Sequence, residues 1–190
     1  MSGDLRRFDE RYRAPGRLDP VYYSEEWGVN ANRALNAQDR RALGLTWKPR
    51  PTLALRADYA ELSADSGFFA RRRDATADWS GRLAGHGRLE RVDNRQPGSV
   101  YDSEGFRNKA QANVAWGGTV FVRPEASLDF EDRVPPAASD SAAARYRQWD
   151  AGATFPGLGP VALTLGAGQR FDAVRDSGAW LPRTRSDRVK

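Results

Sequence analysis

The stretch Leu43 to Tyr59, LGLTWKPRPTLALRADY, decides the fold, because it can fold back on itself at KPRP into two matching arms. In that hairpin Trp47 faces Leu53, and Leu45 faces Leu55. Successive side chains of a strand point to opposite faces, so one face of both arms is apolar. The other face carries small and charged residues: Gly44, Thr46, Lys48, Ala54, Arg56 and Asp58.

The same construction recurs three times further along the chain, in the stretches 74–91, 109–132 and 148–171. Each combines a period of two with a short turn rich in Pro or Gly, and Leu5 to Tyr12 adds a candidate edge strand. A helical period would scatter both sets of residues around an axis. The sequence therefore predicts an all-β chain, an antiparallel up-and-down meander of about eight to nine strands.

This pattern divides the chain into three parts. Residues 39–173 form the antiparallel meander of four hairpins, with short turns at one end and longer polar connections at the other. Residues 1–38 combine the edge strand with a long polar and aromatic loop, and residues 174–190 form a polar tail. The role of the loop at 13–38 is not predicted by the pattern.

Composition narrows the classes of function. The chain has 190 residues, no Cys and a formal net charge of +5. Without Cys, disulfides and thiolate chemistry are excluded. Arg is interspersed with Asp and Glu along the chain, and the basic run Arg71 to Arg73 is followed at once by Asp74, so the charge does not favour nucleic-acid binding.

Alternating strands, unequal loops and aromatics towards the strand ends resemble those of bacterial outer-membrane β-barrels, over roughly Asp39 to Asp172. The resemblance implies a lipid-facing wall with aromatic girdles, in an incomplete barrel that is a segment of a larger one. The residues assigned to this face are Leu43, Leu45, Trp47, Leu53, Leu55, Tyr59, Trp79, Leu83, Val114, Trp116, Leu128, Phe130, Trp149, Phe155, Val161, Leu163, Leu165 and Phe171.

The resemblance also implies a wet lumen on the opposite face, lined by Arg56, Asp58, Asp78, Arg82, Lys109, Asp129 and Arg170. The expected function is the structural wall of a Gram-negative pore, transporter or receptor. Its partners would be membrane lipid and the remainder of the barrel or a partner chain. The expected location is the outer membrane, on condition that an N-terminal targeting segment is missing from this chain. No cofactor or metal is expected.

Two alternatives remain open, because alternation alone does not say which face lies inside. A soluble β-barrel or sandwich would bind an apolar ligand against Trp47, Trp116 and Trp149. A surface assembly module would pair with another chain through its sheet edges.

Arg91 is a difficulty for the membrane interpretation. The predicted register of the second hairpin places it opposite Trp79 on the apolar face, where a cation in mid-bilayer costs about 2 to 4 kcal/mol.

The sequence carries no enzyme signature. The single histidine, His86, is predicted to lie in a tight turn, and no GxSxG motif is present. Carboxylates that share the polar face, such as Asp74 and Asp78 or Asp129 and Glu131, fit a mixed-charge wet wall better than an acid–base pair. The prediction is a protein without catalytic, cofactor or metal residues.

Overall fold

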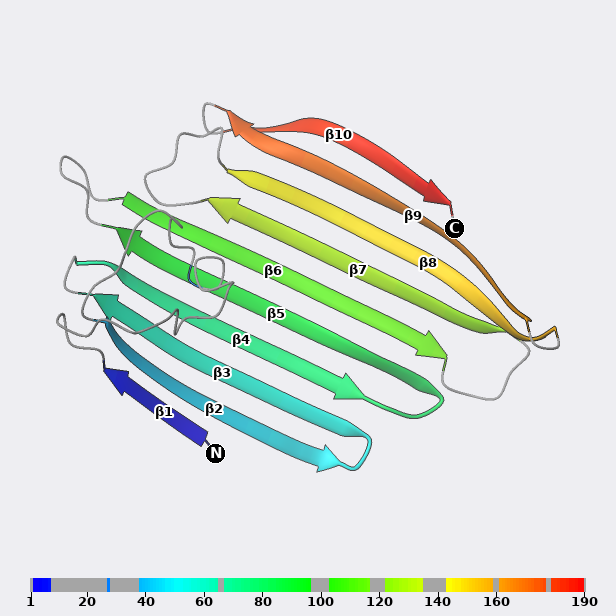
Figure 1. Ribbon diagram of the computed structural model, residues 1–190, viewed down its shortest axis with the longest axis horizontal. Coiled ribbons are helices and arrows are strands. Elements are labelled where there is room, and N and C mark those ends of the chain that lie inside the picture. The colour runs from blue at the N-terminus through cyan, green and yellow to red at the C-terminus, as the bar shows by residue number, and fades with distance from the viewer. Residues whose placement is uncertain are drawn as a thin grey trace, which may run out of the picture.

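The computed structural model consists of strands that follow one another along the chain (Figure 1). It describes residues 2–7, 27, 38–64, 67–96, 103–116, 122–134, 143–158, 161–176 and 179–189. The strands are β1 (Ser2–Arg7), β2 (Gln38–Arg50), β3 (Leu53–Ala64), β4 (Phe69–Trp79), β5 (Leu83–Gln96), β6 (Ser103–Trp116), β7 (Arg123–Val134), β8 (Ala144–Leu158), β9 (Val161–Asp176) and β10 (Ala179–Val189).

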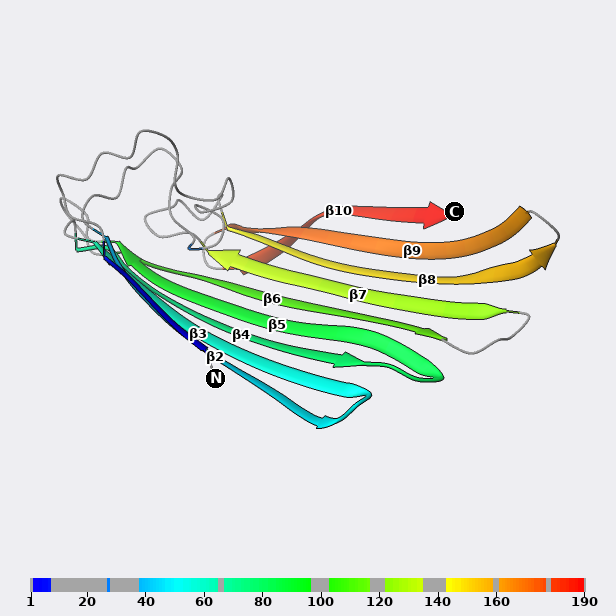
Figure 2. The same ribbon diagram turned by 60° about the horizontal axis from the view of Figure 1, so that its bottom comes forward.

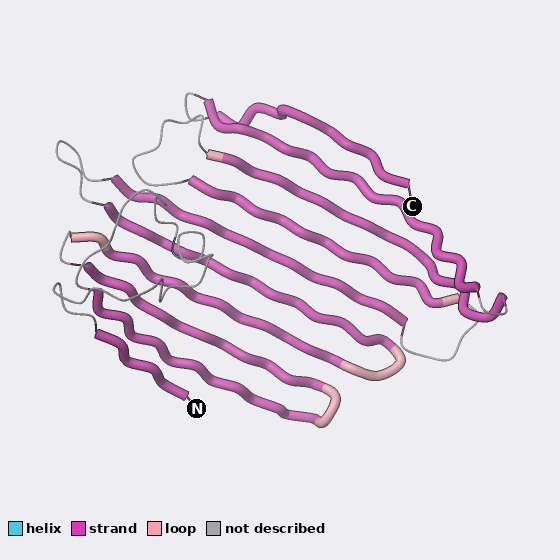
Figure 3. The backbone as a smooth tube through the Cα atoms, in the orientation of Figure 1, coloured by secondary structure: helices cyan, strands magenta, loops and turns pink. Residues whose placement is uncertain are grey.

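The ten strands form one sheet in which each strand pairs antiparallel with the next in sequence (Figures 1 and 3). The prediction of an all-β, antiparallel up-and-down meander is confirmed. The sheet is curved rather than flat (Figure 2). Within the described residues β1 and β10 each pair on one side only, so hydrogen bonds do not close the sheet, which fits an incomplete barrel.

The two faces of the sheet differ in character, because the register keeps residues of one parity together on every strand. One row of cross-strand neighbours runs from Leu45 through Ala57, Ala75 and Leu89 to Ala110. The adjacent row, on the opposite side, begins Thr46, Arg56, Thr76, Arg88 and Gln111. We call these sides the apolar face and the polar face.

The strand pairing of the first hairpin is displaced by two residues from the predicted pairing. Trp47 pairs with Leu55 rather than Leu53, the turn occupies Pro51 and Thr52, and a register shift lies between Trp47 and Arg50. Because the displacement is an even number of residues, every side chain keeps its predicted face.

The second hairpin, by contrast, turns earlier than predicted. The turn lies at Ser80 to Arg82, where Gly81 has a positive φ of 146°, a conformation that favours glycine. His86, predicted to lie in the turn, is therefore a residue of β5 and pairs with Asp78. Arg91 pairs with Arg73 and not with Trp79, which moves it away from the middle of the apolar face.

The two ends of the chain also differ from the prediction. The segment predicted to be a polar tail forms β10, whose register with β9 shifts between Pro182 and Thr184. Proline is tolerated at such an irregularity, where the regular ladder of hydrogen bonds is already interrupted. At the other end the edge strand is β1. The long loop predicted within 13–38 lies outside the described residues except for Trp27 and for Gln38, the first residue of β2.

The tight turns are staggered across the sheet (Figure 1). The row of neighbours that starts at Leu53, next to the first turn, reaches Ala151 in β8, from which that strand continues to Leu158. A cumulative offset of this kind accompanies strands that are tilted relative to a barrel axis.

The one buried apolar cluster among the described residues lies on the polar face, away from the tight turns. Trp27 is fully buried there against Ala60, Leu62, Phe68 and Ala70. The guanidinium of Arg40 lies 5.5 Å from the centre of the indole ring. The Asn94 side chain donates a 3.2 Å hydrogen bond to the carbonyl of Trp27. Trp27 thus contacts residues of four strands, β2 to β5, that are distant from it in the sequence.

Candidate functional site

Exposure on the sheet does not follow the polarity of the side chains. Large apolar side chains are exposed, including Trp47 at 60%, whereas the carboxylates of Asp74 and Glu90 lie in residues that are only 7% exposed. Asp and Glu are almost never buried unless they are paired, and extended apolar patches of this kind mark contact surfaces. Both faces are therefore candidate sites, each with its own chemistry.

The residues that the sequence assigns to a lipid-facing wall share the apolar face by register. Those exposed by more than a third are Leu43, Leu45, Trp47, Tyr59, Leu83, Trp116, Leu128, Trp149, Leu163, Leu165 and Phe171. Trp79 and Phe155 are half-buried on the same face. Val161 pairs with Leu158 in the ladder, but its side chain lies outside the described residues.

The Trp79 ring lies along the sheet rather than away from it. A Cβ atom built on Gly85, its partner in β5, would overlap the indole ring, and one on Gly87 would lie 3.8 Å from it. Because Gly85 and Gly87 have no side chains, the indole ring of Trp79 can pack directly on the backbone of β5. The aromatic side chain thus covers a strand glycine.

Charges on the polar face lie in rows that cross the strands. An acidic row contains Asp58, Asp74 and Glu90, and continues beyond Lys109 to Glu131 and Asp172. The row on one side carries Arg56, Arg88 and Arg170. The row on the other side carries Arg72, Arg107 and Arg133. Carboxylates thus lie between two rows of guanidinium groups.

The rows converge most closely at Glu90. Arg88 donates to Asp74 at 2.5 and 2.8 Å and to Glu90 at 2.7 Å. Arg107 also donates to Glu90. Arg72 lies 3.4 Å from Asp74 and 3.3 Å from Glu90. Three guanidinium groups therefore surround two buried carboxylates, and both carboxylates are compensated.

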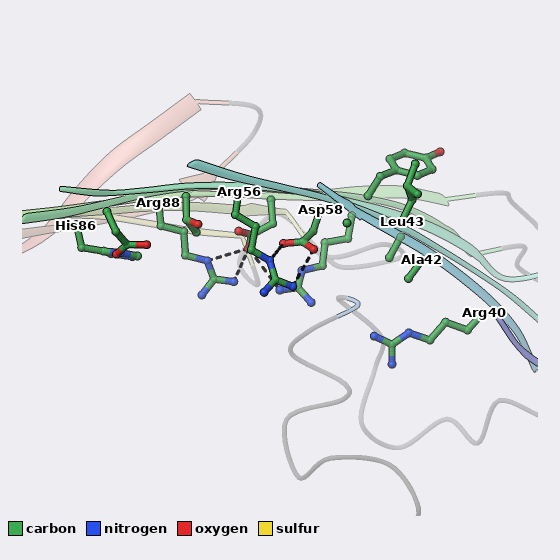
Figure 4. Close-up of a pocket in the computed structure, with 14 residues that line it drawn as sticks. Arg40, Ala42, Leu43, Arg56, Asp58, His86 and Arg88 are labelled. Carbon is green, nitrogen blue, oxygen red and sulfur yellow. Dashed lines mark hydrogen bonds and ion pairs between the residues drawn. The ribbon is translucent and has the colours of Figure 1, made fainter. Parts of the chain in front are cut away.

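A hollow of about 630 Å³ lies beside this cluster on the polar face (Figure 4). On the same side of the sheet lie the side chains of Arg56, Arg88 and His86. Arg56 donates two hydrogen bonds, of 2.5 and 2.9 Å, to the Asp58 carboxylate. His86 Nδ1 lies 2.6 Å from Asp78 Oδ1. The hollow is open to water, and both positively and negatively charged side chains line it.

Most of the predicted lumen residues share this face by register, namely Arg56, Asp58, Asp78, Lys109, Asp129 and Arg170. Arg82 does not, because it lies exposed in the turn between β4 and β5. Arg170 is held by Asp172 at 2.9 Å and lies 4.3 Å from the Tyr146 ring centre.

Sequence reasoning missed the centre of the charged cluster, Glu90 and Arg107, and it missed Trp27. The turn at Gly81, had it been recognised, would have placed Glu90 opposite Asp74. The docking of Trp27 involves residues far apart in the chain and has no local signal.

None of the described residues belongs to a helix long and apolar enough to cross a membrane. Nor do the described residues include a group of three or more carboxylate or histidine side chains arranged to hold a metal ion.

Comparison of the chain with protein-family models, with curated proteins and with solved structures finds no significant match.

Proposed function

We propose that the chain forms part of the wall of an outer-membrane β-barrel, with its apolar face against lipid and its polar face lining a water-filled lumen. The exposed apolar face opposite buried, paired carboxylates is the observation that carries this proposal. Leu, Trp and Phe side chains are exposed on one face, while neutralised carboxylates are buried on the other. A lipid-facing wall needs no packing partner for its apolar residues, and a lumen wall accommodates ionised groups.

The open edges support a segment of a larger barrel, since unpaired backbone groups are not tolerated in lipid. β1 and β10 would then pair with further strands of the same wall or of a partner chain. The charged rows would set which solutes pass, because rings of charged side chains control permeation through narrow pores.

The chain's own tryptophans test the proposal. The purified full chain is refolded in the presence of phosphatidylcholine vesicles whose acyl chains carry bromine, a quencher of indole fluorescence. Trp47, Trp116 and Trp149 are exposed on the apolar face, so we expect strong quenching by bromine in the acyl chains.

A soluble carrier of apolar ligands would behave differently. It would stay in plain buffer without detergent, and its tryptophan fluorescence would not respond to brominated lipid. An assembly module would form edge-paired oligomers without entering the vesicles. Either result would contradict the membrane proposal.

A further inference from the structure

A line of polar residues bounds the apolar face on its side away from the tight turns. On each strand from β2 to β10, the apolar residues and glycines that lie towards the tight turns end at one polar side chain of the same face. We call these residues the polar line, which consists of Arg41, Glu61, Arg73, Arg91, Asn108, Asp132, Arg147, Gln169 and Asp187. Both charges and neutral amides occur among them, so they share polarity and not a net charge.

The polar line crosses the strands obliquely. At one end Arg41 and Glu61 are partners in the β2–β3 ladder. At the other end Gln169 and Asp187 are partners in the β9–β10 ladder, in the row of neighbours that contains Trp47. Trp47 lies six residues further along β2 than Arg41, towards the first tight turn. The line therefore shifts by about 20 Å of strand between β2 and β10.

The opposite edge of the apolar face shifts in the same direction. The apolar residue next to the first tight turn is Leu53 of β3, and its row reaches Ala151 in β8. In β8 the apolar residues continue through Ala153 to Phe155, four residues beyond that row. Both edges of the apolar face are thus inclined to the rows of the sheet, and they are inclined the same way.

The distance between the two edges is nearly constant. The segments 53–59, 83–89, 110–116 and 149–155, of β3, β5, β6 and β8, each present only apolar residues or glycine on this face. Each segment spans seven residues. That length corresponds to roughly 20 to 23 Å of strand, and the lipid-facing band of a membrane barrel is about 25 Å tall. The two edges therefore bound a band whose height matches that of a hydrocarbon layer.

We propose that the polar line lies at the boundary between hydrocarbon and water, so that the strands cross the membrane at about 25 to 30° from its normal. The shift of about 20 Å over eight strand spacings of about 4.8 Å gives this angle, and the edge near the tight turns gives nearly the same one. The inference rests on the proposed function, since it requires the apolar face to lie in lipid. Polar side chains are costly within hydrocarbon and tolerated at its edge.

The inclination explains an exposed ion pair on the apolar face of β10. Arg185 and Asp187 share rows with Leu45 and Trp47, and both charged side chains are more than 60% exposed. In a band parallel to the rows this pair would lie among acyl chains. In an inclined band it lies at the boundary with water or beyond it.

The larger apolar residues beyond the polar line are mostly covered. On the same face of β4 to β10 these are Phe69, Phe106, Val134, Phe171 and Trp180. Only Phe171 among them is exposed by more than a third. The guanidinium of Arg185 lies 5.6 Å from the centre of its ring. An aromatic ring beside a cation suits the head-group layer, where both water and apolar groups are present.

The experiment measures the depth of single fluorescent probes in vesicles that contain the refolded full chain. Leu45→Cys, Leu165→Cys and Asp187→Cys each provide one attachment site, and all three positions are exposed on the apolar face. Lipids with bromine near the head group or near the end of the acyl chain report the depth of each probe. Leu45 and Leu165 each lie four residues from the polar line, so their probes should lie equally deep, about 12 Å deeper than the probe at 187.

Asn108→Cys is the matched control, because it places a probe on the polar line in the middle of the sheet. Its probe should report the same depth as the probe at 187. In a band parallel to the rows, the probe at 187 would lie at least as deep as the probe at 45, and aqueous iodide would quench the probe at 165. Either result would overturn the inference. Protection of the probe at 165 from both bromine and iodide would also overturn it, since protein would then cover that part of the face.

The two proposals fail in different ways. If bromine in the acyl chains quenches the tryptophans but the probe depths follow the rows of the sheet, the inclined band is wrong and the membrane wall stands. If neither the tryptophans nor the probes respond to bromine, both are wrong.

Discussion

Arg73 and Arg91 face each other across the β4–β5 ladder, with the Asp93 carboxylate in contact with both. Two like charges directly opposite in a sheet destabilise it unless a counter-charge intervenes. Asp93 supplies that charge, and the pair marks the line at which the apolar face ends. In the proposed lipid-facing wall, Arg91 therefore lies at this boundary and not in the middle of the apolar face.

The buried carboxylate of Glu90 should be required for stability. Glu90→Gln removes a charge contacted by Arg72, Arg88 and Arg107, leaving guanidinium groups without full compensation. Breaking a buried pair costs about 3 to 5 kcal/mol. Urea unfolding of the refolded chain in detergent should show the transition midpoint falling with an unchanged slope.

Asp187 provides the control for this prediction. It pairs with Arg185 at 3.5 Å, but both side chains are more than 60% exposed. Asp187→Asn should leave the transition midpoint close to that of the wild-type chain, because an exposed ion pair contributes little to stability. Equal losses in the two variants would show that the cluster around Glu90 has no special role.

The glycine beneath Trp79 should be sensitive to a single methyl group. Gly85→Ala places a Cβ atom against both the Trp79 indole ring and the backbone oxygen of Asn113, so the ring or the strands must move. We expect a loss of about 1 to 3 kcal/mol in the free energy of unfolding. Gly87→Ala, whose Cβ would lie 3.8 Å from the same ring, should be tolerated. If both variants unfold at the same urea concentration, Trp79 does not rest on Gly85.

Trp27 should hold its part of the chain against the polar face. Trp27→Ala removes the buried ring and its contact with Arg40, and the loss should be about 3 to 5 kcal/mol. Limited proteolysis should then cut near Phe68, which packs against the indole, more readily than in the wild-type chain. Trp47→Ala, which removes an exposed ring on the other face, should leave this cleavage unchanged. An unaltered cleavage rate in Trp27→Ala would contradict the docking.

Alternation along the strands predicts on which face of the sheet each side chain lies. The hairpin at Leu43 to Tyr59 has the faces that alternation predicts, even though its register is displaced by two residues, because an even displacement preserves parity. The second turn was misplaced because two glycine-rich stretches compete, and Gly85 serves the packing of Trp79 rather than a turn. Only the positive φ of Gly81 distinguishes the actual turn.

The missed strand and the missed contacts have a different cause. β10 has polar residues on both faces around Thr184, Arg185 and Ser186, so it carries no alternation and is specified by pairing with β9. The cluster at Glu90 and the docking of Trp27 depend on neighbours that are distant in sequence. Local patterns therefore predict the strands and their faces, whereas the charged site requires the register.

The central claim, that one face of the sheet meets lipid and the other meets water, is tested most directly with cysteines, because the natural chain has none. Ala75→Cys, Thr76→Cys and Ala77→Cys lie in succession on β4, and each is labelled with a fluorescent probe after refolding into vesicles. We predict that bromine in the acyl chains quenches the probes at 75 and 77, while aqueous iodide quenches the probe at 76. Quenching of all three probes by iodide would contradict the claim, because water would then reach both faces.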